Sequence, residues 1–168
     1  CYKLPESAPQ ALGKPMINLL PIEQEEKIHT VMPMPEDESS WEKLQIIFAT
    51  KNGNIRRNQL SDFTNIRQNG KIAMKLNEND ELVSVIPCGE KDNILLATRL
   101  GKAIRFDVHD VRVFVGRGSS GVRGIKLKPN DFVVSMSLIP NEEKRFVLSV
   151  TENGFGKRTP IEEYRKTN

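Results

Sequence analysis

A short pattern recurs three times along this 168-residue chain. In each copy an apolar run ends in threonine, a glycine follows three residues later, and an arginine stands four residues past the glycine. The glycines are 48 and 53 residues apart, a spacing typical of propeller-like or solenoid arrays in which each repeat is one small sheet. An acidic residue also recurs nine positions past each glycine. The copies are Thr50, Gly53, Arg57 and Asp62; Thr98, Gly101, Arg105 and Asp110; and Thr151, Gly154, Arg158 and Glu163.

Each repeat carries the signals of short strands. The runs at 46–50, 94–98 and 146–151 are apolar, of strand length and rich in β-branched residues. The Asn-Gly pairs at 52–53 and 153–154 favour hairpin turns, because asparagine and glycine tolerate positive φ. The second strand should follow each turn.

The second half of each repeat is less regular. Segments 58–63, 107–111 and 160–164 are expected to form one helical turn or a loop. In residues 74–76 and 125–127 a lysine stands between two apolar residues, an alternation that predicts a half-buried third strand. The recurring acidic residues are expected to cap this region or to pair with the nearby arginine.

The repeats divide the chain into four parts. Residues 1–43 are expected to form the end of one unit plus an acidic linker, 44–92 and 93–145 two complete units, and 146–168 the start of a further one. A single unit buries its apolar face only by stacking on a neighbour. We therefore expect an all-β fold, a propeller-like array of four-stranded blades, as part of a larger domain.

Charge is unevenly distributed along the chain. Residues 1–43 carry a net −4 and residues 44–168 a net +7, which together give +3. A basic stretch spread along a repeat array favours a polyanionic partner, and nucleic acid is the first candidate. An ordinary solvated surface is the alternative interpretation for any single lysine or arginine.

Twelve basic residues are candidates for contacts with phosphate, because they recur in the repeat or stand on predicted strand faces and loops. Aromatic residues are rare among them, which favours duplex DNA over base stacking with single strands. The candidates are Arg56, Arg57, Arg67, Lys71, Lys75, Arg105, Arg112, Arg117, Arg123, Lys126, Lys157 and Arg158.

The sequence offers no active site. Residues 116–121 (GRGSSG) match a dinucleotide-binding motif, but residues 122–127 read as a strand where that motif requires a helix, so a flexible surface loop is expected. His29 and His109 stand far apart with no further ligand at metal-binding spacing. No apolar run approaches the about 20 residues that span a bilayer, and two cysteines fit a reducing cytoplasm.

The chain resembles the C-terminal domain of the bacterial DNA gyrase A subunit over essentially its whole length. The stretches that carry the resemblance are 13–22 (GKPMINLLPI), 48–56 (FATKNGNIR), 121–127 (GVRGIKL) and 153–164 (NGFGKRTPIEEY). The related A subunit of topoisomerase IV has a more degenerate version of the repeats, so their regularity favours gyrase.

The resemblance implies a six-bladed β-pinwheel whose neighbouring blades exchange strands, and of which this chain holds the end of the first blade to the start of the fourth. It also implies a basic rim that wraps duplex DNA and so supports negative supercoiling. The partners implied are duplex DNA, the gyrase B subunit, plus the rest of the gyrase A subunit, in the bacterial cytoplasm and with no membrane. ATP and Mg²⁺ are expected to act through other regions of the enzyme, with no cofactor in this part.

Two departures from the family narrow the expected function. The basic, glycine-rich box of the first blade is not found in the sequence, and Tyr2 and Tyr164 match no catalytic tyrosine. We therefore expect weak DNA binding without strand cleavage. A propeller that binds acidic protein partners is the main alternative, and a propeller enzyme with a central active site is a third.

Overall fold

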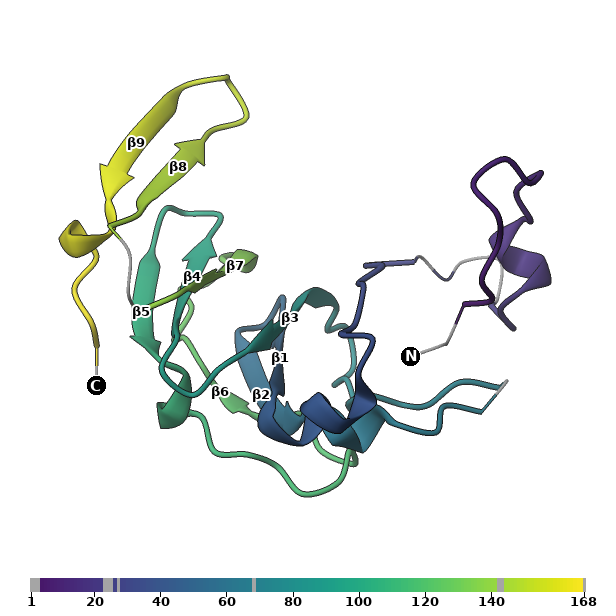
Figure 1. Ribbon diagram of the computed structural model, residues 1–168. Helices are drawn as coiled ribbons and strands as arrows, with labels where there is room; N and C mark the ends of the chain where they lie inside the picture. The colour runs from purple at the N-terminus through teal and green to yellow at the C-terminus, as the bar shows by residue number, and fades with distance from the viewer. Residues whose placement is uncertain (1–3, 23–25, 27, 68, 142–143, 168) are drawn as a thin grey trace.

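The computed structural model describes residues 4–22, 26, 28–67, 69–141 and 144–167, and its sheets are all antiparallel. Three sheets follow one another around a curve in chain order (Figure 1). The first has the order β3-β1-β2-β6, the second β5-β4-β7, and the third β8-β9. The strands are β1 (Gln45–Thr50), β2 (Asn54–Gln59), β3 (Leu82–Cys88), β4 (Asn93–Thr98), β5 (Ala103–Asp107), β6 (Val122–Arg123), β7 (Val133–Ile139), β8 (Phe146–Val150) and β9 (Gly156–Pro160).

The recurring threonine and glycine form the hairpin that opens each sheet. Gly53, Gly101 and Gly154 have φ of 82°, 79° and 80°, a region that glycine enters without steric cost. The threonine hydroxyl accepts a hydrogen bond from the amide of the residue after the glycine, at 3.2, 3.1 and 3.2 Å in the three hairpins. The predicted hairpin turns are therefore confirmed, and the hydroxyl explains why threonine recurs there.

A 3₁₀ turn follows each hairpin, which settles the choice between a helical turn and a loop. The turns are η3 (Leu60–Phe63), η4 (Val108–Asp110) and η5 (Ile161–Glu163). The first residue of each turn is buried. Its amide donates to the carbonyl of the residue just before the hairpin's first strand, which is Leu44, Asp92 or Arg145. Each turn thereby closes its own hairpin. Two further 3₁₀ segments, η1 (Met16–Asn18) and η2 (Glu38–Lys43), lie earlier in the chain.

The sheets stack face to face through their first strands. Ile47 and Ala49 of β1 share a buried cluster with Ile94 and Leu96 of β4. Leu95, on the opposite face of β4, packs with residues of the third unit in a smaller cluster. Burying an aliphatic side chain of this size stabilises a fold by about 1.5–3 kcal/mol. Stacking therefore buries what a single sheet would leave exposed, as the repeat predicts.

Neighbouring units also exchange backbone. Strand β6 belongs by sequence to the second unit, yet it pairs with β2 of the first sheet, in the register Asn54↔Arg123 and Ile55↔Val122. Two isolated parallel bridges repeat this scheme, Arg57↔Val113 and Arg105↔Lys166. Strands β2 and β5, the second strands of the first two hairpins, thus each pair with a segment of the unit that follows.

The predicted third strands are wrong in extent. Residues 74–76 form no strand, and in the second unit only Val122–Arg123 does. Past Arg123 the amides of Gly124 and Ile125 both donate to the carbonyl of Gly53, so the chain turns onto the hairpin instead of continuing along β2. The predicted alternation holds in the second unit, where Ile125 and Leu127 are at least half-buried and Lys126 is exposed. In the first unit Met74 is buried, but Leu76 is exposed together with Lys75.

Within the described residues, the model contains no helix of the length and apolar character that a bilayer crossing requires.

Candidate nucleic-acid interface

Arg56 is an internal residue, only 1% exposed. Its Nε donates to Asn58 Oδ1 at 2.7 Å and its Nη1 to Ser119 Oγ at 2.9 Å, and the guanidinium also donates to the backbone carbonyls of Gly116 and Ser119. Its Cζ lies 5.0 Å from the ring centre of Phe114. Every acceptor except Asn58 belongs to the second unit, so this side chain binds protein across the joint between two sheets.

Burial sets the electrostatics of Arg56. Loss of water lowers the pKa of its guanidinium, the charge of Asp62 opposes that shift, and the charge of Arg117 adds to it. A buried cation costs several kcal/mol unless it is paired or hydrogen-bonded. Here the hydrogen-bond acceptors and the face of Phe114 offset that cost, so the positive charge of Arg56 stabilises contacts within the protein.

Arg57 is 5% exposed and lies on the other face of β2. Its Nη1 donates to Gln45 Oε1 at 2.9 Å, and Gln45 in turn donates to Glu90 at 3.2 Å. Burial lowers the pKa of its guanidinium, and the opposing charges of Cys88 and Glu90 only partly offset this shift. The placement of Arg56 and Arg57 is at odds with direct phosphate contact, because neither guanidinium is at the surface.

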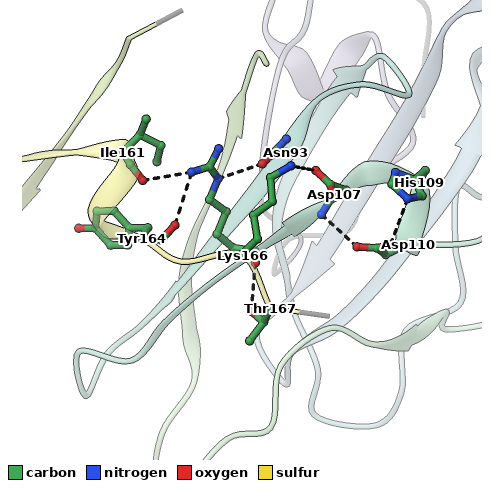
Figure 2. A network of polar contacts seen from close by, with 9 residues as sticks. Asn93, Asp107, His109, Asp110, Ile161, Tyr164, Lys166 and Thr167 are labelled. Carbon is green, nitrogen blue, oxygen red and sulfur yellow. Dashed lines mark hydrogen bonds and ion pairs between the residues drawn. The ribbon is translucent and has the colours of Figure 1, made fainter. Parts of the chain in front are cut away.

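Arg105 is the counterpart of Arg57 in the second unit and is half-buried. Its Nε donates to Asn93 Oδ1 at 2.9 Å, and its Nη1 reaches the carbonyls of Ile161 and Tyr164 at 3.1 and 3.4 Å (Figure 2). Asn93 occupies the same place in β4 as Gln45 does in β1. Both arginines thus donate to the polar residue that begins the neighbouring strand of their own sheet, and Arg105 also reaches the third unit.

Arg158, the third copy, is exposed. Its Cζ lies 3.7 Å from the ring centre of Phe146, which takes the place of Gln45 and Asn93 at the start of β8. A cation over an aromatic face is an attractive contact that leaves the outer side of the guanidinium open to solvent. Of the three recurring arginines, only this one presents its charge at the surface.

Three of the loop cations meet at one hollow of about 610 Å³. Arg67 and Lys71 come from the first unit and Arg117 from the second, and Asn65, Asn69, Gly70, Ile72 and Gly118 complete the described lining. Arg117 Nη1 donates to the carbonyl of Ile72 at 3.0 Å, and Lys71 Nζ donates to the carbonyls of Asp62 and Thr64 at 2.7 and 3.0 Å. Among the residues that the structure describes, no carboxylate side chain lines the hollow, so its surface is basic and polar.

The sequence did not single out the two asparagines of the hollow. Asn65 has a φ of 54°, a conformation that asparagine tolerates better than most residues. The asparagine could therefore have indicated a turn at this position from the sequence. Their proximity to Arg117 depends on the docking of a segment about fifty residues later in the chain, which no local pattern reveals.

The other five candidates lie on the surface. Arg112 stacks on Phe114 with its Cζ 4.2 Å from the ring centre, on a ring that Arg56 also contacts. Arg123 is on the short exposed strand β6. The remaining three are Lys75, Lys126 and Lys157, all exposed. With Arg67 and Arg158, seven of the twelve candidates are exposed, three are half-buried and two are buried.

The loop 116–121 lies at the surface as expected, and hydrogen bonds hold it at Gly116, Arg117 and Ser119. Besides the contacts with Arg56, Asn58 Nδ2 donates to the carbonyls of Phe114 and Gly116 at 3.1 and 2.9 Å, and the amide of Lys75 donates to the carbonyl of Ser119 at 3.3 Å. The expected strand, β6, does follow the loop, so no helix is present there to complete a dinucleotide site.

The recurring acids have structural contacts in two repeats. Asp62 Oδ2 accepts from Asn58 Nδ2 at 3.0 Å, and Asp110 Oδ2 accepts from the amide of Asp107 at 3.1 Å as part of a capping box. Cys88 is buried, and loss of water raises the pKa of its thiol to about 12, so the thiol stays protonated at neutral pH.

The repeats match a known family. A sequence model of the DNA gyrase C-terminal domain, described as a β-propeller, matches residues 45–89, 92–140 and 145–168. The chain belongs to this family. The matched stretches correspond to the three repeat units of the sequence, and the gyrase-type, propeller-like fold expected from the sequence is confirmed.

Relatives and solved structures agree with this assignment. The DNA gyrase A subunit of Rickettsia bellii is 41% identical over 99% of this chain and 24% of its own length, and that of Granulibacter bethesdensis is 51% identical over 84% of this chain and 15% of its own. A solved C-terminal domain of DNA topoisomerase IV has a TM-score of 0.83 at 28% identity, covering 98% of this chain and 50% of that one. A solved DNA gyrase A C-terminal domain has a TM-score of 0.77 at 28% identity, covering 92% and 50%. The chain therefore spans about a quarter of the first of these relatives and half of each solved domain.

Proposed function

We propose that this chain is a non-catalytic module that binds duplex DNA through its phosphates, as part of a type II DNA topoisomerase of the gyrase kind. The observation that carries the proposal is the basic hollow, where Arg67, Lys71 and Arg117 from two units of a gyrase-family fold meet with no acidic side chain in the described lining. Phosphate oxygens accept hydrogen bonds from such cations irrespective of base sequence.

The proposed interface consists of those candidate cations that are exposed or line the hollow. Duplex DNA carries a dense, regular array of negative charge, so each cation that neutralises a phosphate releases a counterion and adds to affinity. Arg56 and Arg57 are left out because they are buried, and Arg105 because its donors are engaged within the protein. The interface comprises Arg67, Lys71, Lys75, Arg112, Arg117, Arg123, Lys126, Lys157 and Arg158.

The wider role follows from the family. We propose that the module serves the negative supercoiling of a bacterial gyrase in the cytoplasm, together with the B subunit plus the rest of the A subunit. ATP and Mg²⁺ would act in those other regions, and no cofactor is assigned to this part. DNA wrapping would require the neighbouring blades as well, because wrapping needs a long, curved, basic path.

The test is the binding of duplex DNA by the chain at a series of salt concentrations, followed by fluorescence anisotropy. We expect log affinity to fall linearly with log salt, with a slope of about −0.9 per phosphate neutralised. The double variant Arg67→Gln, Arg117→Gln should make this slope shallower by about 1.8 for DNA of any sequence.

A matched control removes the same charge elsewhere. The variant Lys14→Gln, Lys43→Gln loses two exposed cations from the acidic N-terminal part and should leave the slope unchanged. Binding that does not respond to salt, or an equal effect of both double variants, would contradict the proposed interface. Equal competition by polyglutamate would favour an acidic protein partner instead.

A further inference from the structure

Arg117 owes its position in the hollow to a residue that never reaches the surface. The carbonyls of Gly116 and Ser119, which flank Arg117 in the chain, both accept hydrogen bonds from the guanidinium of Arg56. One buried side chain therefore fixes the backbone before and after Arg117. We propose that Arg56 is a positioning residue for DNA binding, which holds segment 114–119 so that Arg117 faces Arg67 and Lys71. This inference rests on the function proposed above.

The direction of the bonds supports a locking role. Arg56 donates from three nitrogens, to Asn58 on its own strand and to Gly116 and Ser119 across the joint. A guanidinium presents its donors in one rigid plane, whereas a lysine ammonium is a compact charge that cannot span these acceptors together. The geometry therefore requires arginine at this position, beyond the need for a positive charge.

The sequence of the other repeats shows that the lock is specific to one joint. Three residues past the recurring glycine, where the first unit has Arg56, the second has Ile104 and the third has Lys157. A residue needed merely to build a blade would be expected in each unit. Arg56 instead coincides with the joint in which a loop of the following unit brings an arginine to a basic hollow.

The test is a double-mutant cycle for duplex DNA binding by the intact 168-residue chain, with Arg56→Lys and Arg117→Gln. Arg117→Gln alone should weaken binding about fivefold, which is the size of one surface phosphate contact. Arg56→Lys keeps the charge but loses the planar fork, so it should weaken binding by a similar factor. In the Arg56→Lys background, Arg117→Gln should then have little further effect.

Arg57→Met is the matched control. Arg57 is a buried arginine on the same strand, but its side chain donates to Gln45 and not to segment 114–119. In the Arg57→Met background, Arg117→Gln should retain its full fivefold effect. A general loss of stability would alter both backgrounds alike, so only positioning predicts a difference between them.

The outcomes separate the inference from the function on which it rests. Multiplicative effects of Arg56→Lys and Arg117→Gln on binding would overturn the positioning role and leave the DNA-binding proposal intact. If the wild-type chain failed to bind duplex DNA, the proposed function and this inference would both fall.

A second variant applies if Arg56→Lys does not fold. Asn58→Ala removes the other side-chain hold on Phe114 and Gly116. It should reduce the effect of Arg117→Gln and speed amide hydrogen exchange in 114–119 more than in β1 or β4. A full fivefold effect of Arg117→Gln in this variant would count against positioning by the lock.

Discussion

The joint between the first and second sheets and the joint between the second and third share a backbone register but differ in their side chains. In the first, the amide of Phe114 donates to the carbonyl of Arg57 at 2.8 Å, and in the second the amide of Thr167 donates to that of Arg105 at 2.8 Å. Each acceptor lies four residues past the recurring glycine. The backbone scheme therefore belongs to the repeat itself.

The side chains at the two joints work in different surroundings. The first joint is held by Arg56, which is buried among carbonyls of the next unit. The second is held by Arg105, which is half-buried, and by an ion pair of Lys166 with Asp107 at 2.5 Å whose side chains are 42% and 26% exposed (Figure 2). The same backbone pairing thus carries buried side-chain contacts at the first joint and solvent-accessible ones at the second. This difference in burial determines how much stability each mutation should remove.

The largest expected difference comes from removing the arginine at each joint. Arg56→Met removes the hydrogen bonds that a buried guanidinium donates to Asn58, Gly116 and Ser119, which should lower the free energy of unfolding by about 3 kcal/mol. Arg105→Met should cost about 1 kcal/mol, because water reaches the half-buried site and the other contacts of the joint remain. Urea unfolding followed by circular dichroism measures both values. Equal costs would mean that burial does not distinguish the joints.

The close approach of backbone at the first joint gives the next effect. A Cβ on Gly121 would stand 2.2 Å from the carbonyl oxygen of Ile55, and its φ is +89°. Gly121→Ala should therefore destabilise the chain by about 2 kcal/mol, the segment detaching to relieve the clash. Gly118→Ala is the control from the same loop, since nothing lies within 4 Å of its Cβ position and its φ is not positive. Its unfolding midpoint in urea should match that of the wild type within error.

The repeat made the hairpins predictable but not the fate of the arginines. Thr98 and Gly101 interact within a few residues, so their spacing alone specifies the turn. Arg57 and Arg105 also recur because each occupies the same structural position in its repeat. Each of them, however, pairs with a residue more than fifty positions later, Val113 and Lys166 respectively. Recurrence shows that a residue occupies the same position in each repeat. It does not show whether water or the next unit surrounds the residue there, and Arg57, Arg105 and Arg158 differ in this respect.

The same reasoning separates the parts of the candidate site. Exposure of the loop cations follows from their polar surroundings in sequence, and the structure agrees for Arg67 and Arg112. The hollow forms where segment 113–123 of the second unit returns to the first unit, through its contacts with Arg56 and Arg57 and the pairing of β6 with β2. Pairing between units is a tertiary event, so a local pattern could place these residues on loops but could not bring them together.

The ion pair of the second joint should respond to salt where the first joint does not. Lys166→Gln removes the partner of Asp107 and should cost about 0.5 kcal/mol at low ionic strength, the size of an exposed pair. In about 1 M salt this cost should vanish, because the screening length is then about 3 Å. The cost of Arg56→Met should persist, since the Arg56 guanidinium is buried and salt does not screen it. Urea unfolding at two salt concentrations makes the comparison, and a salt-independent cost for Lys166→Gln would show that its contact is not electrostatic.

The smallest expected effect concerns the turn of the second hairpin and appears only in acid. Asp131 Oδ1 accepts from the amides of Leu100 and Phe132 at 3.0 and 2.9 Å. Burial acts to raise the pKa of this carboxyl, but these bonds, the Thr98 hydroxyl and the charge of Lys128 together bring it below its ordinary value of 3.8. A group whose pKa is lower in the folded than in the unfolded state stabilises the fold above the unfolded pKa and loses that contribution as pH falls through the folded one. The melting temperature of the wild type should therefore exceed that of Asp131→Asn near neutral pH, and the gap should narrow as the pH falls below the ordinary carboxyl pKa of 3.8. A gap that stayed constant as the pH fell would show that the oxygen's position, and not its charge, supports the turn.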